Sequence, residues 1–179
     1  MNIEQIIQEA QNAGFTLVAP LDIKTITMMP EVRKMCEVNK CDAYGSNWAC
    51  PPACGTLEEG SDLISQYKSG IIVQTTGQLE DDFDSEGMME TAKKHDENIR
   101  RFIEEFRKKY DTKMLPLGAG GCRICKKCTY PNEPCRFPDS MIYPMEGLGI
   151  LVSDVCIKNN VPYNHGRGTL TYVGCCLFA

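Results

Sequence analysis

Three cysteines in steps of three, Cys122, Cys125 and Cys128, constrain this chain more than any other feature of its sequence. They stand in the segment GAGGCRICKKCTYPNEPCRFP, residues 118–138, and a fourth cysteine, Cys135, follows after six residues. Glycine, lysine and proline surround these cysteines, and such residues pack poorly in a hydrophobic core. We therefore expect a loop wound around a metal centre, with the rest of the chain positioning that loop.

The number of cysteines also argues against disulfides. The chain holds 11 cysteines among 179 residues, an odd number that excludes complete pairing within one chain. Its first residues, MNIEQIIQEAQ, lack the basic region of a secretory signal and carry Glu4 and Glu9. This predicts a cytoplasmic protein, in which thiols stay reduced. Metal or cluster ligation explains the cysteines better than a disulfide framework does.

Length and charge exclude several classes of protein. The chain is long enough for one domain over residues 1–179 with its own hydrophobic core, so cysteines are not needed to stabilise it. A net charge of -5 argues against nucleic-acid binding, which needs a basic face. No apolar run approaches the roughly 20 residues that span a bilayer, so no membrane partner is expected.

Hydrophobic periodicity and turn residues predict alternating helices and strands. The expected helices are residues 2–14, 30–38, 56–68, 88–110 and 144–159. The expected strands are residues 15–19, 21–29, 71–76, 113–118 and 169–178. From residue 71 onward, strand and helix alternate, which predicts an α/β fold: a small mixed sheet covered by helices, with two cysteine-rich cluster-binding loops.

Local signals refine four of these elements. Asn2 is expected to cap the N-terminal helix, and Thr56 with Glu59 forms a capping-box pattern. Pro116 would confine strand 113–118 to a sheet edge. In helix 30–38, Val32, Met35 and Cys36 are expected to face inward.

The spacing C-x2-C-x2-C of residues 122–135, the second cysteine field, is characteristic of a [4Fe–4S] cluster. Ferredoxins close the motif with C-x3-C-P, whereas here Cys135 comes after six residues and Arg136 follows it. Cys135 is therefore either the fourth ligand of the same cluster or a ligand of another. Backbone N–H groups of the glycines and the charges of Lys126 and Lys127 suit an anionic cluster. A structural zinc site with four thiolates is the alternative.

The first cysteine field, residues 36–54, is less regular. Its spacing is C-x4-C-x8-C-P-P-x-C, and a second [4Fe–4S] cluster, a zinc site and unligated thiols are all open for it. If both fields bind clusters, eight cysteines are cofactor and metal ligands: Cys36, Cys41, Cys50, Cys54, Cys122, Cys125, Cys128 and Cys135.

The other three cysteines are expected in the core. Cys156 lies on the inner face of its predicted helix and behaves as a small hydrophobic residue. Cys175 and Cys176 are adjacent in a strand, so their side chains face opposite ways.

Glu146, His95 and His165 carry weaker signals. Glu146 is expected to stabilise a helix start, with a catalytic role as the alternative. His95 lies on an apolar helix stripe, which is typical of a core histidine, and His165 lies in a glycine-rich loop. The sequence contains no nucleotide-binding, nucleophile-elbow or HExxH motif. The catalytic residues, if the protein is an enzyme, stay unassigned.

These residues resemble a family of predicted metal-binding proteins, domain of unknown function 2284, found mainly in anaerobic bacteria and archaea. The resemblance covers residues 30–179 and implies metal binding without implying a reaction. The run MEGLGILV at 145–152 is similar to the family's usual S-M-E-A-x-G-I-D-V and differs at Pro144, Gly147 and Leu151. The other matching pieces are the Cys36/Cys41 pair, Tyr44-Gly45, Trp48, CPPAC at 50–54, CRICKKC at 122–128 and PCRFP at 134–138.

The leading hypothesis is an iron–sulfur protein with two [4Fe–4S] clusters that passes electrons to or from a redox protein partner in anaerobic metabolism. A second hypothesis is an enzyme whose [4Fe–4S] cluster has an open iron and acts on a small molecule or a sulfur species. A third is an interaction module stabilised by zinc.

Overall fold

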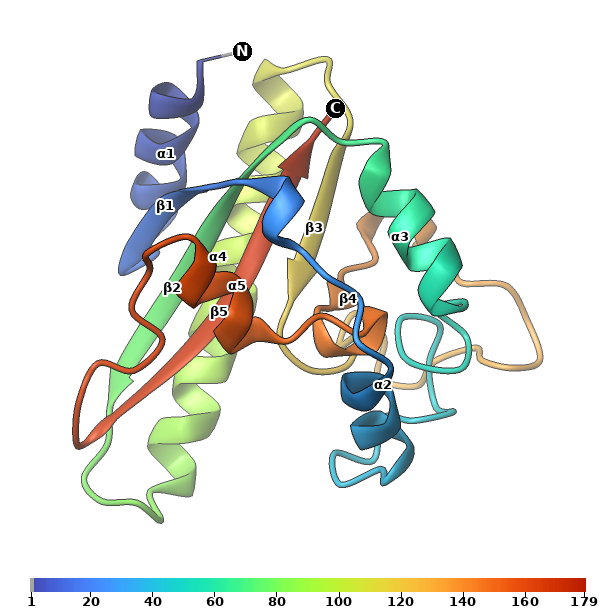
Figure 1. The fold of residues 1–179 in the computed structure, drawn as a ribbon. Helices are drawn as coiled ribbons and strands as arrows, with labels where there is room; N and C mark the ends of the chain where they lie inside the picture. Colours follow the sequence, from blue (N-terminus) through green and yellow to red (C-terminus); the bar gives the residue numbers. More distant parts are fainter. Residues whose placement is uncertain (1) are drawn as a thin grey trace.

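The structure is a computed structural model that describes residues 2–179, so Met1 of the expected domain lies outside the description. Five strands form one mixed sheet in the order β1-β2-β5-β3-β4 (Figure 1). Only the pair β3–β4 is parallel. The strands are β1 (Leu17–Leu21), β2 (Ser69–Gln78), β3 (Met114–Gly118), β4 (Tyr143–Pro144) and β5 (Thr169–Phe178).

The centre of the sheet is the long antiparallel pair of β2 and β5, which runs from Ser69 opposite Phe178 to Gln78 opposite Thr169. Branched and apolar side chains in both strands favour this extended, buried arrangement. β4 pairs only with Leu117 and Gly118 of β3. Pro116 therefore lies where β3 has a neighbour on one side only, which agrees with the expected preference of proline for a sheet edge.

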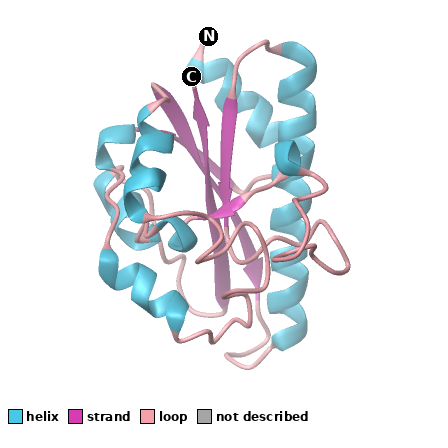
Figure 2. Ribbon diagram, turned by 90° about the vertical axis from the view of Figure 1, so that its right-hand side faces the viewer, coloured by secondary structure: helices cyan, strands magenta, loops and turns pink. Residues whose placement is uncertain are grey.

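Helices cover both sides of the strands (Figure 2). The side chain of Asn2 caps the first helix by accepting the backbone N–H of Glu4 at 2.9 Å. Both hydrogen bonds of the capping box of Thr56 and Glu59 are present at the third α-helix. The helices are α1 (Ile3–Asn12), α2 (Pro30–Glu37), α3 (Leu57–Ser65), α4 (Ser85–Lys109) and α5 (Val152–Lys158), with the 3-10 turns η1 (Ile23–Thr25), η2 (Pro138–Ser140) and η3 (Glu146–Leu148).

Each face of the sheet has its own hydrophobic core. α1 and α4 cover one face, where Phe102 and Phe106 pack with Cys176. η3 and α5 cover the other face, where Leu148 and Cys156 pack with Cys175. All three of these cysteines are fully buried. The prediction that Cys156 is a core residue and that Cys175 and Cys176 face opposite ways is therefore confirmed.

Two of the predicted elements are wrong. Leu21 ends β1, and residues 22–29 form no separate strand; Asp22 accepts the N–H of Lys24 at 3.1 Å, and the Thr25 hydroxyl donates to the Asp22 carbonyl at 2.6 Å. These local bonds favour the 3-10 turn η1 over a strand. The predicted helix 144–159 is divided, because Gly149 takes a left-handed conformation with φ of +82° and ends η3 before α5 begins.

Two smaller expectations also differ from the structure. β1 continues through Pro20, at the edge of the sheet, rather than ending before it. In α2, Val32 is buried as expected, but Met35 is 70% exposed. Because α2 is short and contacts mainly η3, it has only a narrow buried side.

Within residues 2–179, none of the helices is both long and apolar enough to cross a membrane. Beyond the β3–β4 edge, two long loops extend from this frame (Figure 1). One connects α2 to α3 and the other connects β3 to β4. These two loops, with the end of α2, carry the cysteine fields.

Candidate metal centres

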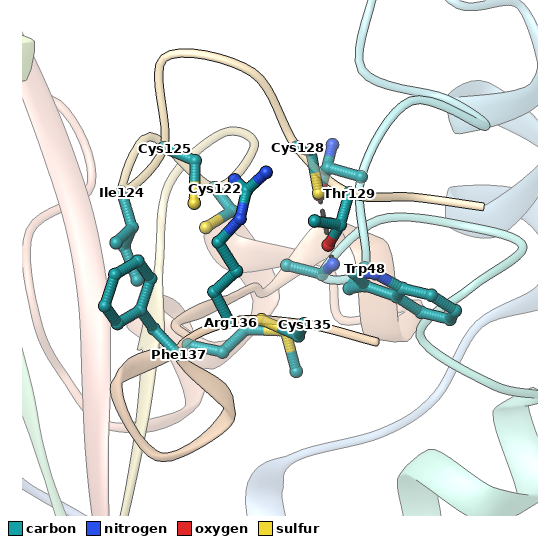
Figure 3. A pocket seen from close by; sticks show the side chains of 12 residues that line it. Trp48, Cys122, Ile124, Cys125, Cys128, Thr129, Cys135, Arg136 and Phe137 are labelled. Carbon is teal, nitrogen blue, oxygen red and sulfur yellow. Dashed lines mark hydrogen bonds between the residues drawn. The ribbon is translucent and has the colours of Figure 1, made fainter. Parts of the chain in front are cut away.

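The second cysteine field surrounds one small, enclosed cavity of about 20 Å³. Figure 3 shows the sulfur atoms of Cys122 and Cys125 close together, with Cys128 and Cys135 on other sides of the same space. All four thiols are half-buried. The structure thus brings together the four predicted ligands of this field, Cys135 included.

Local hydrogen bonds return the chain from Cys128 to the position of Cys135. The Thr129 hydroxyl donates to the Pro134 carbonyl at 2.9 Å. The Arg136 guanidinium donates to the Lys127 carbonyl at 3.1 Å. The six-residue interval to Cys135 is therefore folded into a compact turn, which explains how a spacing unlike that of ferredoxins still closes the ring of cysteines.

Backbone and charged groups adjust the properties of the Cys122 thiol. Burial raises its pKa, while the N–H of Ile124, which hydrogen-bonds to the sulfur, and the positive charge of Arg100 lower it. Figure 3 also shows the Arg136 side chain extending between Cys122 and Cys128. Burial has the larger effect, so the pKa of Cys122 is raised overall, and the N–H donor and the cation only partly offset the cost of forming the thiolate that binds metal.

The first cysteine field is held against the turn η3. The Cys36 thiol donates to the Glu146 carbonyl at 3.7 Å, and the Cys54 thiol donates to the Gly147 carbonyl at 3.2 Å. Cys36, Cys41 and Cys50 line a cavity of about 450 Å³, much larger than the space inside the second field. Cys41 is exposed, whereas Cys50 is buried.

Asn47 shapes the loop that presents Cys50. Its buried side-chain oxygen accepts the N–H groups of Ala49 at 3.0 Å and Cys50 at 3.1 Å. Earlier in the loop, the side chain of Asn39, at a φ of 55°, accepts the N–H of Tyr44 at 2.9 Å. These asparagine turns replace regular secondary structure and fix the direction of the loop.

Cys50 is influenced by the other cysteines of the first field. Its pKa is raised to about 11, mainly by burial; a hydrogen bond from Asn47 lowers the pKa, and the charges of Cys54, Cys41 and Cys36 contribute to raising it. Burial also raises the pKa of Cys36 and of Cys54. Any metal that bound to these thiols would therefore have to displace protons, so its affinity would depend on pH.

Arg33 is the cation that supports the first field. Its guanidinium donates to the Gly147 carbonyl at 2.7 Å and to the Gly55 carbonyl. The same positive charge lowers the pKa of Cys36 and Cys54, against the larger effect of burial. Arg33 thus joins α2 to the starts of η3 and α3 while offsetting negative charge on two thiolates.

The two fields lie side by side. The Trp48 indole N–H, from the first field, donates to the Glu133 carbonyl of the second at 3.1 Å. The Trp48 ring meets the Tyr130 ring edge-on with a centroid distance of 5.0 Å. A Cβ on Gly121 would lie 3.1 Å from the Cβ of Ala43, so glycine allows this close approach of the loops.

Tyr143 occupies the space between the fields. Burial raises the pKa of its hydroxyl, and the charges of Cys54 and Cys135 raise it further. One residue of each field therefore lies near the same phenol. Both fields belong to a single region at the β3–β4 edge of the sheet.

Each field offers the kind of donor that thiolate-bound metal centres use. Each contains four thiols, with a cation and N–H donors nearby. In the part of the chain that the structure describes, no three Cys, His, Asp or Glu side chains converge on the position of a single metal ion. The cysteines of a field are instead related by lining the same cavity and by the effect of their charges on one another's pKa.

The other candidate residues have distinct surroundings. His95 is 1% exposed, and its Nδ1 lies 3.0 Å from the Thr75 hydroxyl, so the predicted core histidine is confirmed. His165 lies in an exposed loop with its Nε2 2.9 Å from the Gln74 amide oxygen, far along the chain from both fields. Glu146 begins the turn η3, beside the first field, and burial raises its pKa.

Sequence reasoning missed three residues that shape the centres: Arg33, Asn47 and Tyr143. Asn47 stands in a run of turn-forming residues, which was a usable signal. Arg33 and Tyr143 gave none, because their roles depend on contacts between segments far apart in the sequence.

The comparisons with known proteins support a metal-related interpretation. The sequence model of a family described as "Predicted metal-binding protein (DUF2284)" matches residues 19–178, which agrees with the resemblance found from the cysteine spacing. No curated protein and no solved structure matches the chain.

Proposed function

This chain belongs to the DUF2284 family of predicted metal-binding proteins, and from that membership we propose that it is an iron–sulfur protein with two [4Fe–4S] clusters. Its function is to pass electrons to or from a redox protein partner in anaerobic metabolism. The observation that carries this proposal is the presence of two adjacent cysteine groups: four cysteines line one cavity, and Cys36, Cys41 and Cys50 line another, with Cys54 held at the same turn η3 as Cys36.

The chemistry of the second field supports a cluster with four protein ligands. A [4Fe–4S] cube takes one thiolate at each iron, and C-x2-C-x2-C supplies three from a short segment. Cys135 lines the same cavity as the other three thiols, which supports it as the fourth ligand of the same centre. The N–H of Ile124 and the charge of Arg100 are the kinds of contact that set the potential of a cluster.

The contact between the fields supports electron passage through both centres. Trp48 and Tyr143 lie between the groups, and neither field is separated from the other by an element of the sheet. The half-buried second field lies beside exposed Lys126 and Lys127. Exposed lysines there would attract a partner with an acidic surface.

A count of metal and sulfide in protein purified without oxygen tests this proposal. Two clusters predict about eight iron and about eight acid-labile sulfide per chain, with absorption and electron paramagnetic resonance signals that change on reduction by dithionite. About two zinc per chain and no sulfide would instead identify the zinc-stabilised interaction module. About four iron atoms per chain would mean that only one of the two fields binds a [4Fe–4S] cluster.

A second candidate function, an enzyme, is favoured by one observation. The first field opens onto a cavity of about 450 Å³, within the size range of small-molecule sites. Its Cys41 is the exposed cysteine of the field. A cluster held there by three thiolates would keep one iron open to a small molecule or a sulfur species. The predicted difference is that Cys41→Ser leaves the iron content of this field unchanged.

A further inference from the structure

The cavity beside the first cysteine field has the composition of a ligand site. Its walls are largely apolar, with Val32 and Val152 buried in them and Leu151 exposed. Its polar groups are few: the three thiols on one side, Glu146, Lys40, Ser153 and two tyrosines. Small-molecule sites combine apolar walls with a few polar groups in this way.

Glu146 is the only carboxylate among the described residues that line this cavity. Its side chain is partly buried, and its carboxylate oxygens are not among the buried polar atoms that lack a partner, so the group faces accessible space. Within residues 2–179 it forms no ion pair, and Arg33, a cation that supports this field, is directed to the carbonyls of Gly55 and Gly147. A partly buried carboxylate without an ion-pair partner favours a cationic ligand that can donate a charge-assisted hydrogen bond.

The charge of a metal centre at the first cysteine field would also favour a cationic ligand. Four thiolates around a divalent core, either a zinc ion or an oxidised [4Fe–4S] cube, leave about two negative charges. Lys40 is the only cation among the described lining residues, and it is exposed to water. With a metal centre bound at the first field, the inner part of the cavity would therefore be negative, between walls that are largely apolar.

We propose that this cavity binds a small organic amine, with its ammonium group on the Glu146 carboxylate and its apolar body against Val32, Leu151 and Val152. The inference rests on the proposed function only in requiring that the first field carries a metal centre, of either kind. The proposal names a class of ligand, organic amines, for the cavity that Cys36, Cys41 and Cys50 line.

The test compares three probes of one shape, benzylamine, benzyl alcohol and benzoate, on the full chain purified without oxygen. Binding is measured by calorimetry and by the shift in the spectrum of the metal centre. We expect benzylamine to bind at least tenfold more tightly than benzyl alcohol, and benzoate more weakly than either. Equal affinity for the three probes, or no binding of benzylamine at millimolar concentration, would overturn the proposal.

Three variants separate the charge effect from damage to the fold. Glu146→Gln should weaken benzylamine at least tenfold and leave benzyl alcohol within about twofold. Lys40→Ala should strengthen benzylamine about two- to threefold, a change that a purely structural role does not produce. Ser153→Phe, which fills the cavity, should abolish binding of all probes. Unchanged benzylamine binding in Glu146→Gln contradicts the assignment, even if Ser153→Phe fails to fold.

Iron, zinc and sulfide are counted in every sample, so the two proposals fail in different ways. Benzylamine binding to a zinc-containing, sulfide-free protein retains the amine site and removes the iron–sulfur function. About eight iron and eight sulfide per chain without benzylamine binding would retain the iron–sulfur function and remove the amine site.

Discussion

At the scale of single residues, the cysteines divide by what surrounds them. Cys156, Cys175 and Cys176 are packed among apolar side chains on the two faces of the sheet. Of the other eight, Cys36 lies at the end of α2, and seven lie in loops whose backbone is directed by asparagine turns, proline and arginine. Sequence alone predicted this division, because glycine, lysine and proline around a cysteine already indicate that it is not a core residue.

The division predicts opposite outcomes for two substitutions. Cys125→Ser should remove about four iron per chain, because serine is a poor ligand for a [4Fe–4S] cluster. Cys156→Ala should leave the iron count unchanged, since this thiol only fills core space beside Gln74. Iron and sulfide analysis of both variants checks this. Equal iron in the two variants would contradict the assignment of Cys125.

His95 predicts how stability depends on pH. Burial lowers its pKa to about 4, from an ordinary value of 6.5, so the folded protein holds this imidazole neutral. In the unfolded chain the His95 imidazole binds a proton below about pH 6.5, whereas in the folded chain it binds one only below about pH 4. The free energy of unfolding should therefore fall by roughly 3 kcal/mol as the pH drops through this window.

The measurement is urea unfolding from pH 7 to pH 4 for the natural chain and for His95→Gln, which can keep a contact with the Thr75 hydroxyl. The variant should lose less stability on acidification than the natural chain does. Both proteins retain the same cysteine fields, so acid loss of metal affects them alike. Parallel curves for the two proteins would show that His95 titrates in its usual range.

At the scale of elements, local patterns were predictable and turns made by distant contacts were not. The capping box of α3 and the long stripe of α4 follow from residues within a few positions of each other. The break at Gly149 does not, because the apolar steps continue across it. A Cβ at Gly149 would meet Leu57 of α3, a contact that exists only in the folded chain.

The cysteine fields show the same limit, because contacts between distant segments cannot be predicted from local patterns. Spacing predicted both fields, and the structure supports their grouping, but the cavity at the first field needs α2, the loop at Gly121, η3 and α5 to meet. Their separation in the sequence spans more than a hundred residues. No local pattern indicates such a contact between distant segments. The sequence therefore marked Glu146 as a candidate, but it could not predict the cavity that Glu146 lines.

The contact between the two loops predicts the effect of Trp48→Phe. Phenylalanine keeps an aromatic ring beside Tyr130 but cannot donate to the Glu133 carbonyl. The loss of about 1 kcal/mol should release iron from the protein to a chelator roughly fivefold faster. Tyr172→Phe, which removes a hydroxyl contact with α4 instead, is the matched control and should release iron at the natural rate. Similar release rates in both variants would argue against a supporting role for Trp48.

At the scale of the whole molecule, a net charge of -5 coexists with a local group of basic residues at the second field. Arg123, Lys126 and Lys127 are all exposed there. An acidic redox partner would be repelled by most of the surface and attracted at this edge. Orientation of such a partner then depends on a few charges.

The double change Lys126→Glu with Lys127→Glu should slow reduction by an acidic ferredoxin about tenfold at low salt, with little difference at high salt. Stopped-flow absorption measures the rate. The control, Lys24→Glu with Lys68→Glu, alters the net charge equally but at exposed positions in η1 and just before β2. If both double variants slow equally, overall charge and not this edge governs the encounter.

The position of β5 has a consequence for how such a protein matures. It follows all eight loop cysteines in the chain, yet it lies between β2 and β3 in the sheet. A ribosome therefore delivers both cysteine loops before the strand that joins the two halves of their frame. Until β5 emerges, the loops have no fixed edge on which to converge, so we expect any metal to be inserted only after β5 has joined the sheet.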